Sequence, residues 1–337
     1  MKNLFLLLLL CLACFAATPA QIPSSIPSSP PQRPTDLTVS EGDVLKVDTR
    51  LVRVPFTVIN RKGLPITKLT QEHFRIFEDS VEQTIAAFEP IEEPLTAALL
   101  LDTSPSTRFR LEDIKQAAIT FVNRLRAGDR LIIFSFSDKV LPLTEITGDR
   151  EAVRSAIRNA TEGKTTRLYD AISFANERLA KIAGRKAVIV FTDGIDNSSS
   201  FASAQKTLAL AEESDLLVYA LQYDTFSESS EYSRLDNSVG VGKKTTKVYP
   251  PGLGPRDYER ATAYLRDLTA KSGGRYYHAD DLTGIKQAFS LIGEELRSQY
   301  TLAYYPRIKG DEKRRHNIEV RVDQPQLVVR ARRSYIR

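Results

Sequence analysis

The sequence predicts an α/β fold with a doubly wound, mostly parallel sheet, inserted in a small β-sandwich formed by N- and C-terminal segments. Between residues 93 and 298, apolar runs of strand length alternate with amphipathic helical stretches. This alternation is typical of a parallel sheet covered on both faces. Strand-like segments occupy residues 45–92, and similar segments return over residues 299–337. We therefore expect the two flanking segments to pack together.

Residues 45–92 show the pattern of short strands separated by turns. Residues 45–60 are rich in valine and alternate in part between apolar and polar side chains, which favours a strand. The stretch NRKGLPI, residues 60–66, indicates a turn. Residues 74–90 predict a hairpin around Glu78–Ser80. We interpret this region as the first part of the β-sandwich.

Residues 93–298 predict the α/β domain. Short, continuous apolar runs indicate buried strands at residues 95–101, 129–137, 186–192, 215–223 and 275–279. Apolar side chains at helical spacing indicate helices at residues 110–125, 149–160, 168–184, 203–214, 256–274 and 281–299. Thr225–Pro255 is long and rich in Gly, Ser and Pro, and a loop of this kind is usually functional or disordered.

Residues 299–337 return to strand patterns and are predicted to complete the β-sandwich. This segment is rich in Lys and Arg, but the charges fall within strand patterns. We interpret them as solvent-facing side chains that deter pairing between strand edges. Binding of an anionic partner, such as a polysaccharide, a lipid head group or a nucleic acid, is the less favoured alternative. The whole chain of 337 residues has a formal net charge of +5. That value is mild, so no nucleic-acid partner is expected.

The first 44 residues are predicted to lie outside the fold. Residues 1–20 have a positive charge, an unbroken apolar run and then small residues, which is the pattern of a signal peptide. An uncleaved anchor and a lipoprotein attached through Cys14 are the alternatives. Cys11 and Cys14 both lie in this segment, so the mature chain would have no thiol. Residues 21–44 form a Pro/Ser-rich linker. We expect an exported protein, periplasmic or secreted.

Polar side chains follow the strand predicted at residues 95–101. Asp102, Ser104 and Ser106 come directly after its apolar run. In open parallel sheets, binding sites lie at the carboxyl ends of the strands. Taken singly, Ser106 is equally well interpreted as a helix cap.

Two further polar clusters reach the same edge of the predicted sheet. Thr165 and Thr166 precede a helix, and Asp193 follows the strand at residues 186–192. Two carboxylates together with hydroxyl oxygens suit a hard divalent cation such as Mg²⁺. Few carboxylates would leave the ion able to accept a further carboxylate from another molecule. Thr166 and Asp193 also have simpler interpretations, as a helix cap and a turn residue.

The stretches DTSPS, TRLYDA and FTDG together resemble the metal-ion-dependent adhesion site (MIDAS) of von Willebrand factor A domains. That motif is Asp-x-Ser-x-Ser, a distant Thr and then an Asp. The resemblance implies a bound Mg²⁺ or Mn²⁺, completed by a Glu or Asp of a partner protein. The implied metal ligands are Asp102, Ser104, Ser106, Thr166 and Asp193. EGKTT stands where Gly-Gly-Thr is common, so Thr166 is chosen over Thr165 by its spacing from LYDA.

The resemblance extends beyond this motif over nearly all of the mature chain. LTQEHFRIFEDSVEQTIAAF, SGGRYYHA, LRSQYTLAYYP and VRARRSYIR are similar to segments of exported proteins with such a domain that are common in acidobacteria. Ser80 stands where that group often has Gly, and Thr107 where many relatives have Met.

The predicted function is therefore a metal-dependent protein-binding module. The loops Ser137–Val140, Ile195–Phe201 and Thr225–Pro255 would set specificity around the ion. The alternative is a structural role in assembly of the cell envelope, with the ion fastening the loops together.

An enzyme is not expected. An aspartate-based phosphatase would carry a second Asp two residues after the first, where this chain has Ser104. No Gly-x-Ser-x-Gly motif occurs. His73 and His316 fall in the sandwich segments and His278 on a strand edge, so a Ser-His-Asp triad is not expected either. Each histidine is predicted to be a surface or packing residue. A metal-dependent hydrolase is the less favoured alternative.

Overall fold

The computed structural model describes residues 51–89, 94–223, 252–307 and 314–336. The predicted signal peptide, the linker and most of the Thr225–Pro255 loop lie outside the described residues. Among the helices in the described ranges, none combines the length and the apolar character needed to cross a membrane.

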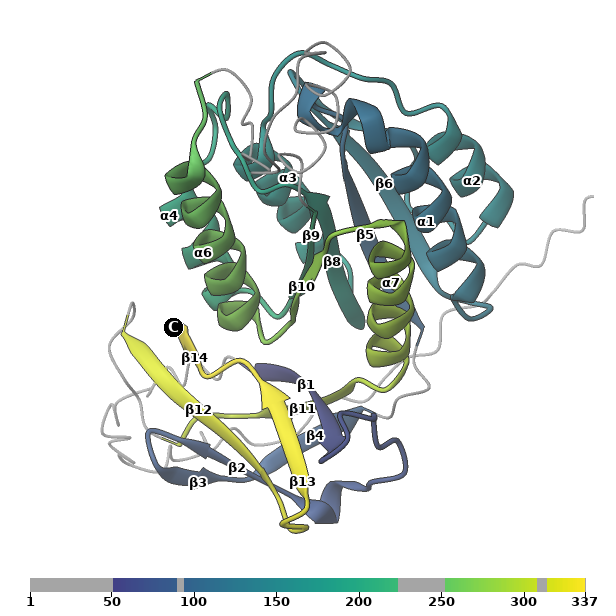
Figure 1. Ribbon diagram of the computed structural model, residues 1–337. Coiled ribbons are helices and arrows are strands. Elements are labelled where there is room, and N and C mark those ends of the chain that lie inside the picture. Colours follow the sequence, from purple (N-terminus) through teal and green to yellow (C-terminus); the bar gives the residue numbers. More distant parts are fainter. Residues whose placement is uncertain (1–50, 90–93, 224–251, 308–313, 337) are drawn as a thin grey trace, which may run out of the picture. The chain divides into compact units, whose positions relative to one another are not determined.

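A six-stranded sheet forms the centre of the α/β domain, in the order β10-β9-β8-β5-β6-β7 (Figure 1). The neighbouring pairs from β10 to β6 are parallel, and β7 is antiparallel at one edge. The strands are β5 (Leu95–Asp102), β6 (Arg130–Phe136), β7 (Val140–Pro142), β8 (Arg185–Thr192), β9 (Leu217–Tyr223) and β10 (Tyr276–Ala279). Every residue of β5, β8 and β9 is buried, as the continuous apolar runs predict.

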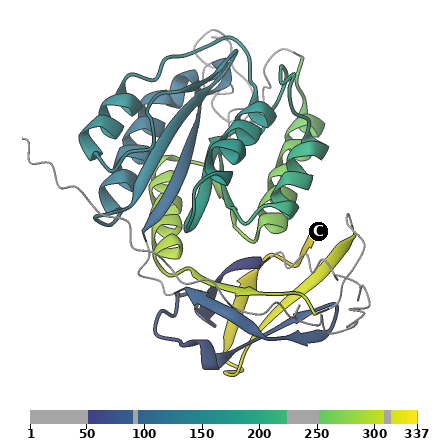
Figure 2. The same cartoon turned by 180° about the vertical axis from the view of Figure 1, so that it is seen from behind.

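Helices cover both faces of this sheet (Figures 1 and 2). Alternate residues of β5 point to opposite faces, so that Leu99 lies in one core and Leu100 in the other. The core on the Leu99 side is closed by α1 (Leu111–Arg124), α2 (Arg150–Arg158) and α7 (Leu282–Arg297). The core on the Leu100 side is closed by α3 (Leu168–Ala180), α4 (Ala204–Glu213) and α6 (Pro255–Ser272).

The remaining strands form two antiparallel four-stranded sheets, β13-β1-β11-β4 and β14-β12-β2-β3. Each sheet combines strands from before and after the α/β domain, and their inner side chains share one core. The strands are β1 (Val52–Asn60), β2 (Phe74–Glu78), β3 (Val81–Gln83), β4 (Ile85–Glu89), β11 (Tyr300–Tyr304), β12 (Arg315–Val322), β13 (Leu327–Ala331) and β14 (Ser334–Ile336). The predicted fold class is therefore confirmed, with the α/β part inserted between the two halves of a β-sandwich.

The hairpin predicted around Glu78–Ser80 joins β2 to β3. Glu78 pairs with Val81, and the two turn residues, Asp79 and Ser80, have φ angles of 46° and 68°. A two-residue turn with both φ angles positive matches the twist of the flanking strands. Glycine adopts such angles without steric cost. This explains why a glycine at the position of Ser80 would suit the turn.

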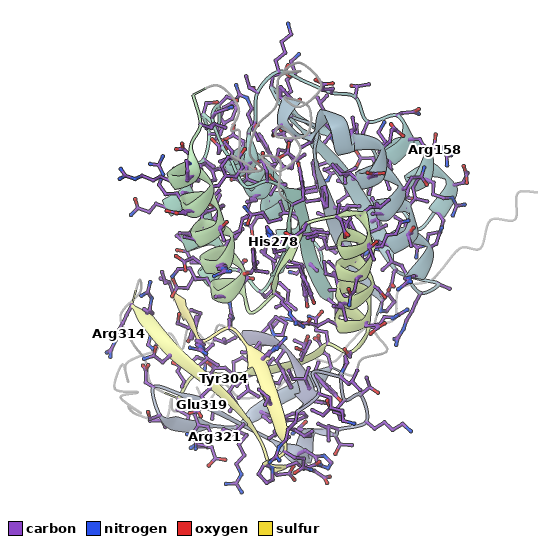
Figure 3. The ribbon with its side chains drawn as sticks, viewed as in Figure 1. Arg158, His278, Tyr304, Arg314, Glu319 and Arg321 are labelled. Atoms are coloured by element: carbon purple, nitrogen blue, oxygen red, sulfur yellow. The ribbon has the colours of Figure 1, made fainter. Side chains whose placement is uncertain are left out.

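Strand β12 alternates strictly between the sandwich core and the surface. Tyr304 lies in the core, whereas Glu319 and Arg321 lie at the surface and pair with each other at 2.7 Å (Figure 3). The interpretation of the C-terminal basic residues as solvent-facing holds for Arg321. It is wrong for Arg332, which is buried and donates to the carbonyl oxygens of Ser214 and Arg53 at 2.7 Å.

Candidate metal centre

Strands β5 and β8 are parallel neighbours and end side by side in polar residues. Asp102 is the last residue of β5 rather than the first of the loop, and Thr192 is the last of β8. The hydroxyl of Thr192 donates to Oδ2 of Asp102 at 2.6 Å. Asp193 follows directly, and its carboxylate caps the loop by accepting from the backbone N–H of Ile195 at 3.0 Å. Both carboxyl groups are fully buried.

The loop after β5 folds tightly around the Asp102 carboxylate. The N–H of Ser104 donates to Oδ1 of Asp102 at 2.9 Å, and the hydroxyls of Ser104 and Ser106 lie 3.0 Å apart. Ser106 sits inside a short 3₁₀ helix, η2 (Pro105–Arg110). Its hydroxyl contacts that of Ser104. Asp102, Ser104 and Ser106 are thus brought together by direct hydrogen bonds.

Thr166 joins the group through the loop that follows Asp193. The Thr166 N–H donates to the side-chain oxygen of Asn197 at 2.8 Å. The Thr166 carbonyl oxygen accepts from the N–H groups of Asn197 and Ser198. The hydroxyl of Thr165 accepts from Ser198 at 2.8 Å, and Thr166 is the more buried of the two threonines. The structure thus ties Thr166 to the Asp193 loop, while its link to Asp102 is indirect.

The loops around this edge are fastened to one another. The N–H of Gly163 donates to the carbonyl oxygen of Thr103 at 2.9 Å, and that of Lys164 to the Asp138 carboxylate at 3.0 Å. Of the loops predicted to set specificity, Ser137–Val140 and Ile195–Phe201 therefore lie at this edge of the sheet.

Asp170, in the first turn of α3, holds the end of the Ile195–Phe201 loop through hydrogen bonds to its backbone. Its carboxylate accepts from the N–H groups of Ser200, Phe201 and Ala202 at 2.8–3.0 Å. Burial alone would raise the pKa of Asp170, but these N–H groups and the Arg167 guanidinium outweigh burial and lower it. Sequence reasoning did not single out Asp170. The acidic residue four positions after Thr166, in the first turn of the helix, was the available signal.

The end of β9 supports Asp193 from the other side. The side-chain N–H of Gln222 donates to the Asp193 carbonyl oxygen at 2.8 Å. Tyr223 is buried, and burial followed by the charges of Asp102 and Asp193 raises its pKa far above the ordinary range. Neither residue was predicted. Both end the strand next to β8, so their position at the shared carboxyl edge was the signal available.

The electrostatics of this edge favour a cation. Burial raises the pKa of Asp102 to about 7, and the negative charge of Asp193 adds to this effect. Hydrogen bonds from Ser104 and Thr192 oppose it in part. Two buried carboxylates that repel each other are relieved by a positive charge. The five predicted ligands offer oxygen atoms alone, so the donor set fits a hard divalent cation.

The family model of the von Willebrand factor type A domain matches residues 97–195, which include all five predicted ligands. No curated protein matches the chain.

Similar solved structures include the protein BatB from Bacteroides thetaiotaomicron, with 18% identity and a TM-score of 0.43 over 59% of this chain and 99% of that one. A von Willebrand factor type A protein from Catenulispora acidiphila has 9% identity and a TM-score of 0.45, over 86% of this chain and 74% of that one. Proximal thread matrix protein 1 from the mussel byssus, whose MIDAS motif is occupied by zinc, has 14% identity and a TM-score of 0.44, over 64% and 48%.

Proposed function

Because the chain contains a von Willebrand factor type A domain, we propose that it is a metal-dependent protein-binding module. The proposed ion is Mg²⁺ or Mn²⁺. Its proposed ligands are Asp102, Ser104, Ser106, Thr166 and Asp193. The observation that carries the proposal is the pair of fully buried carboxylates at neighbouring strand ends, with two serine hydroxyls 3.0 Å apart beside one of them.

The chain's own residues prepare this site by fixing its oxygen atoms in advance. Ser104 N–H and the Thr192 hydroxyl hold the two oxygens of Asp102. Gln222 and the Ile195 N–H hold Asp193 at its carbonyl and carboxylate oxygens. When bound, the cation supplies an electrophilic centre that a carboxylate of a partner protein completes. Preorganisation of this kind lowers the ordering cost of binding.

The partner is proposed to be a protein that presents Glu or Asp beside the loops Ser137–Val140 and Ile195–Phe201. Phe201 supports this assignment, because its side chain is 69% exposed at the end of one of these loops. Exposed aromatic side chains are enriched where proteins bind each other. We also propose that the protein is exported and acts in or beyond the cell envelope, in agreement with the N-terminal sequence pattern.

A structural scaffold is the second proposal, and the hydrogen bonds among the loops favour it. The Gly163–Thr103 and Thr166–Asn197 contacts already hold three loops together, and a cation would fasten them further. We propose binding rather than turnover in either case, because Ser104 stands where a phosphatase of the aspartate type requires a second carboxylate.

Titration calorimetry of the full chain with Mg²⁺ and Mn²⁺ tests the site. We expect one-site binding that is lost in Asp102→Ala and in Asp193→Ala. It should persist in Asp267→Asn, which removes an exposed carboxylate on α6. Circular dichroism checks that each variant folds. Unchanged affinity in both alanine variants would contradict the metal assignment.

A partner search with and without chelator separates the two proposals. Capture of a protein that depends on the ion while the chain stays folded supports the binding module. If chelation instead lowers the unfolding free energy and binding is lost only through unfolding, the scaffold is supported.

A further inference from the structure

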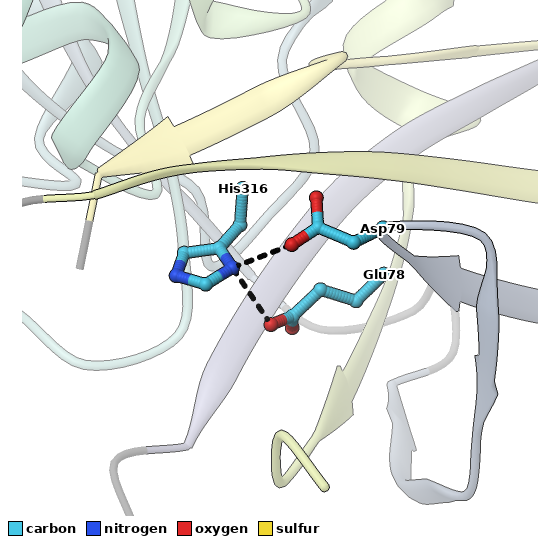
Figure 4. A group of neighbouring side chains, drawn as sticks. All are labelled: Glu78, Asp79 and His316. Atoms are coloured by element: carbon cyan, nitrogen blue, oxygen red, sulfur yellow. Dashed lines mark hydrogen bonds and ion pairs between the residues drawn. The ribbon is translucent and has the colours of Figure 1, made fainter. Parts of the chain in front are cut away.

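The β-sandwich contains a second cluster of metal-ligating side chains, at the turn between β2 and β3. Nδ1 of His316, on β12, lies 2.9 Å from Oδ2 of Asp79 and 3.3 Å from Oε1 of Glu78 (Figure 4). The His316 and Glu78 side chains are almost fully buried, at 2% and 4% exposure. His316 is a buried packing residue, as predicted, and its ring in addition meets two carboxylates.

Each carboxylate of this cluster is oriented by further hydrogen bonds. Oε2 of Glu78 accepts from the Tyr304 hydroxyl at 2.6 Å and from the Tyr335 hydroxyl at 3.1 Å. Oδ1 of Asp79 accepts from the Asn317 N–H at 2.9 Å. One oxygen of each carboxylate is thus held by the chain, while the other faces His316. Outer contacts of this kind orient the ligands in metal sites.

The imidazole is directed at the carboxylates by its surroundings. The His316 ring stacks on Tyr335, with centroids 5.4 Å apart. Its other nitrogen, Nε2, is buried and has no hydrogen-bond partner among the described residues. The polar contacts of the ring therefore run through Nδ1.

The spacing of the three donors is close to that of a bound ion. The donor atoms of Glu78, Asp79 and His316 lie within 4.8 Å of one another. Zinc ligands at about 2.0–2.2 Å in a tetrahedron would be about 3.3–3.6 Å apart. The two distances from Nδ1, 2.9 and 3.3 Å, require only a small expansion to reach that value.

Charge and donor type indicate the class of ion. Two carboxylates carry two negative charges, and a protonated imidazole would balance one of them. A divalent cation would balance both. One imidazole nitrogen with two carboxylate oxygens suits zinc and similar transition metals, whereas Mg²⁺ takes oxygen ligands. The Asp79 side chain is 28% exposed, which leaves a path for the ion from solvent.

We propose that Glu78, Asp79 and His316 form a second cation site, for a transition metal of the zinc class. It would link the N-terminal hairpin to the C-terminal strand β12, which already pairs with β2 in the same sheet. The site is independent of the proposed function, since it shares no residue with the proposed Mg²⁺ or Mn²⁺ site at the sheet edge.

Zinc titration of the full chain, with Cys11 and Cys14 replaced by serine, tests this site. The chain has three histidines, so nitrogen NMR of the imidazole rings follows each one. We expect Zn²⁺ to shift the Nδ1 resonance of His316 to that of a metal ligand, with those of His73 and His278 unchanged. A His316 ring that remains an imidazolium at saturating Zn²⁺ would overturn the proposal.

Calorimetry with Zn²⁺ gives a second readout. The Zn²⁺ affinity should fall at least about tenfold in Asp79→Asn and in His316→Gln. Removing even a residue that only hydrogen-bonds to a metal ligand lowers metal affinity by about that much. It should hold in His278→Gln, which removes an exposed histidine, and in Asp102→Ala, which separates this site from the first. Equal affinity in Asp79→Asn and in the parent chain would overturn the proposal, and Asp79→Asn serves alone if His316→Gln does not fold.

Discussion

The carboxyl edge of the six-stranded sheet and the β2–β3 turn of the sandwich both gather two acidic side chains, yet they differ in every other respect. At the sheet edge, the companions are the hydroxyls of Ser104, Ser106 and Thr192, all from one domain. At the turn, the companion is an imidazole from a strand more than 200 residues later. The first arrangement suits a hard ion that a partner can reach. The second suits a softer ion whose role is internal.

The largest effect is expected when the Mg²⁺ and Zn²⁺ affinities are compared in variants that each lack one ligand of one site. Asp102→Ala should lower Mg²⁺ affinity by more than about 100-fold, since loss of even an outer partner costs 10–100-fold, and should leave Zn²⁺ binding unchanged. His316→Gln should do the reverse. Parallel calorimetric titrations measure both. If either substitution lowered the affinities for Mg²⁺ and Zn²⁺ equally, the two regions would not be separate sites.

The two regions should also respond to pH in opposite directions. Burial and Asp193 raise the pKa of Asp102 from 3.8 to about 7, so the folded state retains a proton that the unfolded state has lost. Without cation, this group favours folding at low pH, and its contribution falls as pH rises from 3.8 to about 7. The Asn317 N–H lowers the pKa of Asp79, so its contribution is present above 3.8 and is lost as pH falls.

Urea denaturation without metal checks these signs, at about pH 5 and about pH 8 for Asp102 and at about pH 3 and about pH 7 for Asp79. As pH rises, the unfolding free energy of Asp102→Asn should increase relative to that of the parent chain. Added Mg²⁺ should reduce this difference, because it stabilises the parent chain. Asp79→Asn should differ more from the parent chain at neutral pH than in acid. If the difference in unfolding free energy between Asp102→Asn and the parent chain stayed constant from about pH 5 to about pH 8, the pKa of Asp102 would not be raised in the folded state.

The fold class was predictable because its signals are local. The buried strands β5, β8 and β9 are continuous apolar runs, and the β2–β3 hairpin is marked by Glu78–Ser80. The donor residues of the sheet edge were also within reach, since parallel strands end at one edge. The Thr192–Asp102 hydrogen bond and the anchoring of a loop by Asp170 were not, because they depend on tertiary contacts between residues 30 to 90 positions apart.

His316 shows the limit most clearly. Its strand pattern indicates the sandwich, but nothing local indicates that Glu78 and Asp79 meet its ring. That contact follows from the antiparallel register of β12 and β2, in which Ile318 pairs with Glu78. A side chain's neighbours across such a register are set by packing rather than by sequence spacing.

A smaller effect is expected when one supporting hydroxyl is removed in each region. Tyr304→Phe deletes a 2.6 Å hydrogen bond to the buried Glu78 and should cost about 2 kcal/mol of unfolding free energy. It should also weaken Zn²⁺ binding while leaving Mg²⁺ binding unchanged. Thr192→Val, which deletes the 2.6 Å hydrogen bond to Asp102, should weaken Mg²⁺ binding instead. Thermal denaturation and the two titrations measure these changes, and a loss of Mg²⁺ affinity in Tyr304→Phe would contradict the separation.

The smallest effect on stability is expected at the rim of the sheet edge. Phe201→Ala truncates an exposed ring and should change the unfolding free energy by no more than about 0.5 kcal/mol. Affinity for a captured partner should nevertheless fall, because exposed aromatic rings anchor interfaces. Val328→Ala, at a half-exposed apolar side chain of the sandwich, is the matched control. Equal partner affinity in both variants would remove Phe201 from the proposed binding surface.

The interleaved strand order of the sandwich has a consequence for synthesis of the chain. β11 lies between β1 and β4, and β12 lies between β14 and β2. As the chain leaves the ribosome, β2 and β3 can pair at once, but β1 and β4 must wait for a strand made some 200 residues later. Once β11 has been made, a folded insert lowers the entropy cost of pairing it with β4, because the insert holds the end of β4 close to the start of β11. A slowly folding insert would therefore leave the early strand edges exposed to aggregation.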